Sequence, residues 1–87
     1  MEATSARARE VIRIQDLKIG QAARIVGYEG GHSPYRTRLL SMGLTRGERI
    51  ELVKVAPMGD PVQIRVRGFS LSLRKQEAAV LILSADL

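Results

Sequence analysis

The sequence predicts a small, mostly β domain: about five strands in a partly open barrel, with one short helix and one helical turn. Two observations carry this prediction. The segment from Val55 to Arg74 alternates hydrophobic and polar residues almost without a break, which is typical of a half-buried hairpin. The chain has 87 residues, which is enough for one domain with a thin core. Only 3% of the residues are aromatic, so this core is expected to be aliphatic. Closing so small a sheet into a barrel protects its edges.

The N-terminal third is expected to hold one strand after an irregular start. Residues 1–10, MEATSARARE, carry charges but no apolar stretch, so they are expected to form a flexible tail and not a secretory signal. The domain then spans residues 11–87. In the segment ARIVGYE, Ile25 is expected on one face of a strand, with Val26 and Tyr28 on the other.

The segment HSPYRTRLLSMG predicts a short helix. Ser33 suits the N-cap because its oxygen can accept a bond from a free backbone N–H, and Pro34 suits the first helical position. Gly43 can adopt the left-handed conformation that ends a helix. The outer face carries Arg36 and Arg38. The apolar positions form one stripe at i, i+4 and i+7: Tyr35, Leu39 and Met42.

The second half of the chain predicts the remaining strands. In RIELVKV the apolar positions change parity, from Ile50 and Leu52 to Val53 and Val55, which indicates a bulge or bend. PMGDP predicts a turn, and a hairpin with a tight corner at Gly68 follows. The core-facing positions of this hairpin are expected to be Val62, Ile64, Val66, Phe69, Leu71 and Leu73. KQEAA predicts the helical turn and VLILS a closing strand. These five strands, one short helix and one helical turn favour an SH3-like barrel over an OB-like barrel, because an OB-like barrel usually needs more residues.

The charge balance favours anionic partners. The chain has 14 basic and 9 acidic residues, a net charge of +5. The polar face of the hairpin carries Arg65, Arg67 and Arg74, which can form a docking face for phosphate groups. That face lacks the aromatic rings on which single-stranded nucleic acid stacks. A basic, nucleic-acid-binding barrel is therefore kept as an alternative.

The residue types needed for metal or acid-base chemistry are sparse. There is no cysteine, and the single histidine, His32, beside Glu29, is more often a solvated loop residue than a ligand. No nucleophile, base and orienting group form a catalytic set. The remaining carboxylates considered are scattered among arginines and are expected to be surface charges: Glu48, Glu51, Asp60 and Glu77. The sequence therefore predicts a binding protein without a catalytic site, metal site or cofactor.

Two segments, RLLSMGLTRG and APMGDPVQIRVRGFSLSLRKQEA, resemble the FeoA family of bacterial ferrous-iron transport accessory proteins. The resemblance covers about residues 16–83, and the same module resembles the C-terminal SH3-like domain of iron-dependent repressors. It places the family's helix at residues 34–42 and its hairpin loop at residues 56–61. It implies a cytoplasmic protein with an SH3-like barrel. The implied partner is FeoB, a membrane ferrous-iron transporter with a GTP-binding domain, which the protein supports or regulates by binding.

Four residues on or just after the helix are predicted to contact that partner: Tyr35, Arg38, Met42 and Arg46. The alternative for Tyr35 and Met42 is that they belong to the core-facing stripe. A metal-responsive module, by analogy with the repressor domain, is a further functional alternative.

Overall fold

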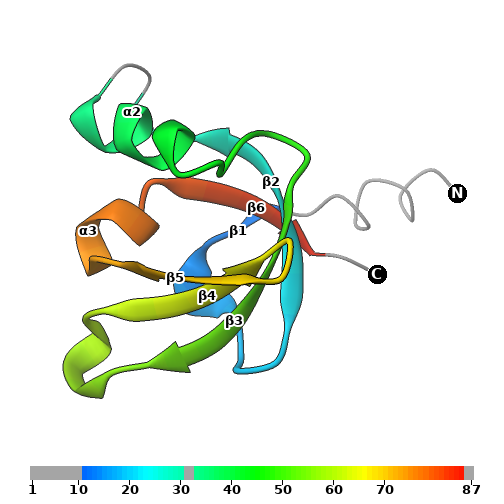
Figure 1. The fold of residues 1–87 in the computed structure, drawn as a ribbon, viewed down its shortest axis with the longest axis vertical. Helices are drawn as coiled ribbons and strands as arrows, with labels where there is room; N and C mark the ends of the chain where they lie inside the picture. The colour runs from blue at the N-terminus through cyan, green and yellow to red at the C-terminus, as the bar shows by residue number, and fades with distance from the viewer. Residues whose placement is uncertain (1–10, 31–32, 86–87) are drawn as a thin grey trace, which may run out of the picture.

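The computed structural model describes residues 11–30 and 33–85, so the expected tail at residues 1–10 lies outside the described part. Figure 1 shows a strongly curved antiparallel sheet with two short α-helices lying on the same side of it. The elements in chain order are β1 (Val11–Ile12), η1 (Ile14–Asp16), β2 (Ala22–Tyr28), α2 (Pro34–Ser41), β3 (Arg49–Val55), η2 (Pro57–Gly59), β4 (Val62–Val66), β5 (Phe69–Leu73), α3 (Lys75–Ala78) and β6 (Leu81–Ala85).

The mostly β fold with one short helix and one helical turn is confirmed, with one strand more than expected. The strand order is β1-β6-β2-β3-β4-β5. The additional strand is β1, whose two residues pair with Ser84 and Leu83 of β6. Two residues carry too little periodicity to be recognised in a sequence. Within the described residues β1 and β5 do not pair with each other, so the sheet curves without closing completely.

Register shifts in two strands decide which side chains face the core. In β2 the pairing with β6 shifts between Ile25 and Gly27, which turns Tyr28 inward beside the core while Val26 stays exposed. The prediction that Val26 and Tyr28 share a face is therefore wrong, because it assumed an uninterrupted strand. The bend predicted in β3 is confirmed by a shift between Leu52 and Lys54.

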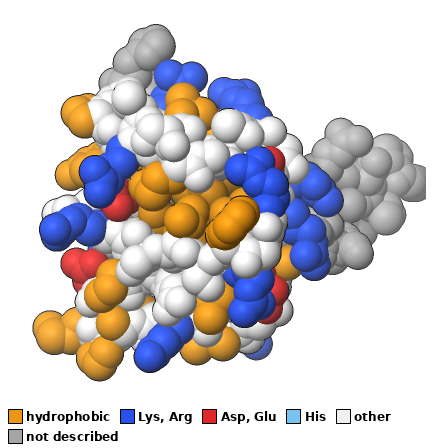
Figure 2. All heavy atoms as spheres, viewed as in Figure 1, with side chains coloured by type: hydrophobic (Ala, Val, Ile, Leu, Met, Phe, Trp, Pro, Cys, Tyr) orange, Lys and Arg blue, Asp and Glu red, His pale blue; other side chains and the backbone are white. Residues whose placement is uncertain are grey.

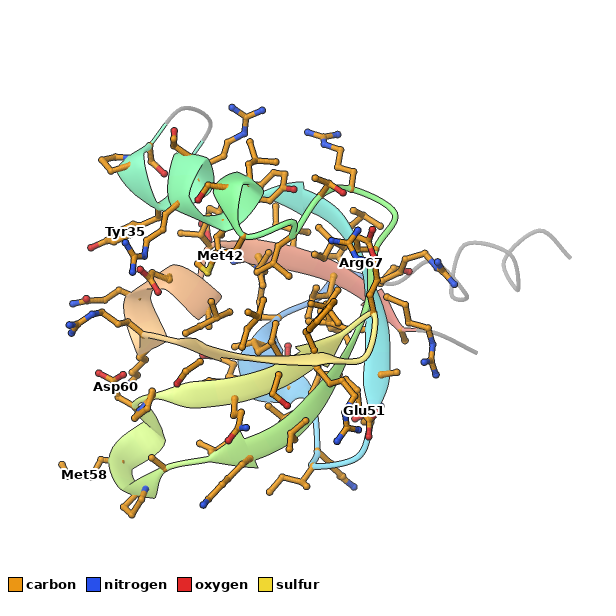
Figure 3. All side chains as sticks on the ribbon, viewed as in Figure 1. Tyr35, Met42, Glu51, Met58, Asp60 and Arg67 are labelled. Carbon is orange, nitrogen blue, oxygen red and sulfur yellow. The ribbon has the colours of Figure 1, made fainter. Side chains whose placement is uncertain are left out.

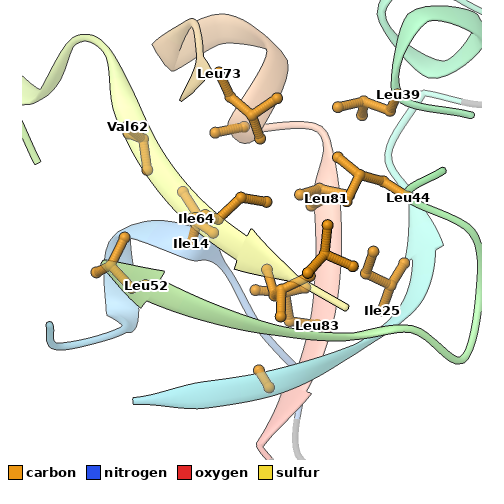
Figure 4. Close-up of a cluster of buried hydrophobic side chains, with 14 of the residues drawn as sticks. Ile14, Ile25, Leu39, Leu44, Leu52, Val62, Ile64, Leu73, Leu81 and Leu83 are labelled. Carbon is orange, nitrogen blue, oxygen red and sulfur yellow. The ribbon is translucent and has the colours of Figure 1, made fainter. Parts of the chain in front are cut away.

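The core is aliphatic and joins every β-strand from β2 to β6 to both α-helices (Figure 4). Each large apolar side chain that is buried contributes about 1.5–3 kcal/mol relative to leaving it in water. The largest fully buried side chains are Ile25, Leu39, Leu44, Ile50, Ile64, Leu73, Leu81 and Leu83.

Helix α2 begins and ends as predicted. Ser33 Oγ accepts a hydrogen bond from the backbone N–H of Arg36 at 3.1 Å, and Pro34 occupies the first turn. Gly43 follows with φ +88°, a left-handed conformation that favours glycine. Of the predicted stripe, Leu39 is fully buried and Met42 packs against the core, whereas Tyr35 is 40% exposed.

The β4–β5 hairpin corrects one expectation about the core. Its two-residue turn has positive φ at both Arg67 (49°) and Gly68 (84°), the geometry that matches the twist of a tight hairpin. Along β5, exposure falls from Phe69 through Leu71 to the fully buried Leu73. Phe69 is 69% exposed, so the prediction that it packs in the core is wrong. It has the parity of the buried residues but lies at the hairpin tip, beyond the elements that would cover it.

Candidate docking surface

Helix α2 and the residue that ends it, Met42, present three of the four predicted contact residues. Figure 3 shows Tyr35 and Met42 pointing from α2 towards α3. Arg38 points the same way, because its Nε lies 2.6 Å from Oε2 of Glu77 on α3. The arginine side chain remains 64% exposed in this pair. Tyr35, Arg38 and Met42 therefore form one ridge along the helix, in which Tyr35 and Arg38 are exposed and Met42 is half-buried against the core.

Glu77 anchors this ridge. Its side chain is 6% exposed, and its Oε1 accepts a hydrogen bond from the backbone N–H of Arg74 at 3.0 Å, at the start of α3. One carboxylate therefore caps α3 and holds Arg38 of α2. The expectation that Glu77 is a surface charge is wrong, since its carboxylate is buried between the start of α3 and Arg38 of α2.

The fourth predicted residue, Arg46, lies against a different partner. The guanidinium carbons of Arg46 and Arg36 lie 5.9 and 5.6 Å from the ring centroid of Tyr28. The Tyr28 hydroxyl donates a hydrogen bond to the carbonyl of Leu44 at 2.5 Å. Burial raises the pKa of Tyr28 above its ordinary value, although the charges of Arg46 and Arg36 act in the opposite direction. The structure thus places Arg46 beside Tyr28 and not with Tyr35, Arg38 and Met42.

An apolar strip that the sequence did not predict lies next to the ridge. We define the α2–β5 strip as Met42, Phe69 and Leu71, which are half-buried or exposed. Figure 2 shows hydrophobic side chains gathered on the surface between α2 and β5. The signal in the sequence was the position of Phe69 directly after the two-residue turn, where a hairpin extends past its core.

Ion pairs lie at both ends of the α2–β5 strip. Arg38 and Glu77 form the pair near α3. At the other end, Nη1 of Arg67 lies 2.7 Å from Oε2 of Glu48. Arg67 also lies against Gly43, because a Cβ built on that glycine would be 2.5 Å from Nη2 of Arg67. The hairpin tip therefore contacts the end of α2. The α2–β5 strip is thus an apolar surface with polar groups at its ends, as is usual for a protein interface.

The basic face of the hairpin is less cationic than the sequence suggested. Nη1 of Arg65 lies 3.3 Å from Oε1 of Glu51, and Arg67 pairs with Glu48. Arginines and glutamates share the lining of a shallow hollow of about 410 Å³ on this face. The two glutamates of this lining offset half of the charge of its four arginines, so its attraction for phosphate groups is weaker than the sequence suggested.

Within residues 11–30 and 33–85, no three His, Cys, Asp or Glu side chains converge into a group that could hold a metal ion. His32 lies outside those ranges. Its expected neighbour Glu29 forms an ion pair with Arg13 at 2.5 Å. None of the described helices is long and apolar enough to cross a lipid bilayer.

The family of the chain follows from a domain model and from a curated relative. The FeoA domain model matches residues 12–84. The chain is 40% identical over 68 residues to an "Fe(2+) transport protein A/Fe(2+) transporter FeoB fusion protein" of Porphyromonas gingivalis, a match that covers 78% of this chain. The chain spans only 8% of the length of that relative.

Solved structures of similar proteins share the fold. A FeoA-like protein from Clostridium acetobutylicum is 36% identical, with a TM-score of 0.79 and 90% of each chain covered. A zinc complex of Stenotrophomonas maltophilia FeoA, described as an SH3 domain protein, is 22% identical, with a TM-score of 0.71 over 84% of this chain and 89% of that one. At that identity the likeness concerns the fold alone, and it confirms the SH3-like class. The chain belongs to the FeoA domain family.

Proposed function

We propose that this protein supports ferrous iron uptake by binding the cytoplasmic portion of a FeoB-like transporter. The observation that carries the proposal is the Porphyromonas gingivalis relative, which joins a similar domain and the transporter in one polypeptide. A covalent link raises the effective concentration of two modules that associate weakly. Separate chains of the same two families are therefore expected to associate through a docking surface of their own.

The ridge of α2 and the α2–β5 strip supply this docking surface. Tyr35, Met42 and Phe69 provide apolar contact area, and Arg38 provides a charged contact beside it. Aromatic residues, Met and Arg are enriched at the centres of protein interfaces. Arg46, which lies over the buried ring of Tyr28, supplies a second, separate contact for the partner.

The remaining features of the proposal concern the whole chain. Residues 11–87 form the transporter-binding domain, and the protein works in the cytoplasm, where it reaches the cytoplasmic portion of the transporter. It binds its partner without transforming a substrate and without a bound cofactor.

Gene deletion combined with affinity capture tests the proposal. Cells lacking this protein are expected to take up less ferrous iron, and the tagged protein is expected to recover the transporter from detergent-solubilised membranes. Normal uptake in the deletion strain, together with no recovered transporter, would contradict the proposal. A tagged variant with both Tyr35→Ala and Phe69→Ala controls for non-specific capture. It should fold but recover less transporter than the unmodified protein.

Nucleic-acid binding is the second candidate, and the net charge of +5 favours it. The pairing of Arg65 and Arg67 with glutamates weakens that argument. Phosphate contacts release counterions, so genuine binding to DNA or RNA would weaken steeply with salt. A titration of labelled DNA and RNA at two salt concentrations distinguishes the candidates, because affinity weaker than about 10⁻⁴ M removes this one.

A further inference from the structure

In β5 the backbone N–H and C=O groups of two residues point away from β4, towards the open edge of the sheet. Val66 and Phe69 flank the two-residue turn and are paired, so they exchange the first pair of ladder hydrogen bonds. The pattern then alternates along the strand. Leu71 and Leu73 therefore bond to β4, whereas the N–H and C=O groups of Ser70 and Ser72 point outward.

These outward groups have no backbone partner within the part of the chain that the structure describes. β5 is the last strand in the sheet order, and no backbone hydrogen bond outside the β4–β5 ladder involves Ser70 or Ser72. Natural proteins usually protect such an edge with charged residues, proline or a covering element. β5 has the sequence FSLSL, without a charge or a proline, in a chain with 26% charged residues. The edge is therefore open to pairing.

The α2–β5 strip lies on the apolar side of this edge. A strand added beside β5 would lie about 4.8 Å from it, with its side chains pointing alternately to the two faces. One set would contact Phe69, Leu71 and Met42. The other set would lie on the polar face, where Arg65 is paired opposite Ser70 and Arg74 follows β5. Apolar residues fit the first set. Polar or acidic residues fit the second, where Arg65 is already paired with Glu51 and Arg74 adds a positive charge.

We propose that β5 receives an extended segment of the partner, which adds a strand to the sheet. The segment alternates apolar with polar or acidic residues. Its backbone pairs with Ser70 and Ser72, and its apolar side chains cover the α2–β5 strip. Strand addition of this kind takes affinity from backbone hydrogen bonds and specificity from alternate side chains. The identity of the partner as a FeoB-like transporter rests on the proposed function above.

Amide hydrogen exchange measured by NMR tests this pairing on the unmodified protein. The probe is the purified cytoplasmic portion of the FeoB-like transporter, added to saturation. The exchange of the Ser70 and Ser72 amides is expected to slow by at least about tenfold, because they gain hydrogen-bond partners. The Leu71 amide already bonds to β4, so it serves as the internal reference.

A matched pair of variants tests the same contact by affinity. Ser72→Pro removes the outward N–H without breaking a hydrogen bond to β4. An edge strand tolerates proline at a position of this kind, where the N–H faces away from the sheet. Ser72→Ala removes only the hydroxyl group. Ser72→Pro is expected to weaken transporter binding by about tenfold, the effect of one lost hydrogen bond and a blocked edge, while Ser72→Ala binds normally. A melting curve for each variant shows whether it is folded.

The outcomes separate the two proposals. Binding with unchanged exchange at Ser70 and Ser72 would overturn strand addition and leave the proposed function standing. If Ser72→Pro fails to fold, the exchange measurement on the unmodified protein decides alone. Absence of binding would contradict both proposals. Slowed exchange that depends on protein concentration without the transporter would show that a second copy occupies the edge, and would also overturn the inference.

Discussion

Tyr28 is the buried polar side chain on which the α2–β3 connection depends. Its hydroxyl group satisfies the carbonyl of Leu44, a fully buried residue, and the guanidinium groups of Arg36 and Arg46 lie over its ring. A buried acceptor left without a donor costs about 1–3 kcal/mol. Tyr28 therefore holds the loop after α2 against the sheet.

The raised pKa of Tyr28 predicts a loss of stability in alkali. In the unfolded chain a tyrosine titrates near pH 10, and the folded state holds the Tyr28 proton more tightly. The stabilising contribution of this residue is therefore complete below about pH 10 and is lost as the pH rises through the folded pKa. Since the chain has 2 tyrosines, a Tyr35→Phe variant isolates Tyr28 for titration by ultraviolet absorbance. A midpoint at or below that of the unfolded variant would contradict the prediction.

Phe69 is predicted to matter for binding and little for folding. Its ring is 69% exposed, so Phe69→Ala should lower the free energy of unfolding by less than about 1 kcal/mol. We expect Phe69 to be a hot spot of the interface, whose truncation costs about 2 kcal/mol or more, so transporter affinity should fall at least about thirtyfold. Calorimetry measures the affinity and thermal melting the stability. Met58→Ala is the control, because Met58 is 93% exposed on the distant η2 turn and should leave affinity unchanged.

At the scale of elements, Glu77 of α3 connects α2 to the start of α3, the helix that follows the edge strand β5. Glu77 Oε1 accepts the N–H of Arg74 at the start of α3, and Oε2 holds Arg38 of α2. The position of the predicted contact ridge therefore depends on a carboxylate that is only 6% exposed.

Substitutions at Glu77 separate its two contacts. Glu77→Gln keeps an oxygen for the Arg74 N–H but loses the charge opposite Arg38, and it should cost less stability than Glu77→Ala. Glu77→Ala removes both contacts and is expected to cost about 1–3 kcal/mol. Denaturant unfolding compares the two variants. Equal stability of the two would show that the cap on α3 contributes nothing.

The two glycines after α2 form a second matched pair. Gly43 and Gly47 have φ of +88° and +91°, where an alanine is strained by about 1–2 kcal/mol. A Cβ on Gly47 would meet nothing within 4 Å, whereas one on Gly43 would displace the guanidinium of Arg67. That group ends a flexible side chain, so both alanine variants should lose similar stability in denaturant unfolding. A loss at Gly43→Ala larger than that at Gly47→Ala by about 3 kcal/mol would mean that Arg67 cannot yield.

Local signals predicted the elements well and their exposure less well. The cap at Ser33, the proline at the helix start and the tight turn at Gly68 are encoded by neighbouring residues. The exposure of Phe69 and the burial of Glu77 depend on where a hairpin tip and a helical turn lie relative to distant parts of the chain. Parity identifies the face of a strand, but it does not show whether another element covers that face.

At the scale of the whole molecule, the candidate site combines segments far apart in the sequence. Tyr35, Arg38 and Met42 were predictable because they lie within about two turns of one helix. Phe69 and Leu71 of β5 join them only through the curvature of the sheet (Figure 1) and the contact between Arg67 and Gly43. No local pattern predicts that arrangement, which explains why the sequence indicated the helix residues of this candidate surface but not Phe69 and Leu71.

The account depends on a stable contact between this surface and the transporter. The direct measurement is crosslinking mass spectrometry of the purified protein with the cytoplasmic portion of the FeoB-like transporter, using photoreactive residues placed singly along the chain. Strong crosslinks are expected at positions 35, 42 and 70, with none at position 58. Crosslinks confined to the η2 turn, or none at any position, would contradict the account.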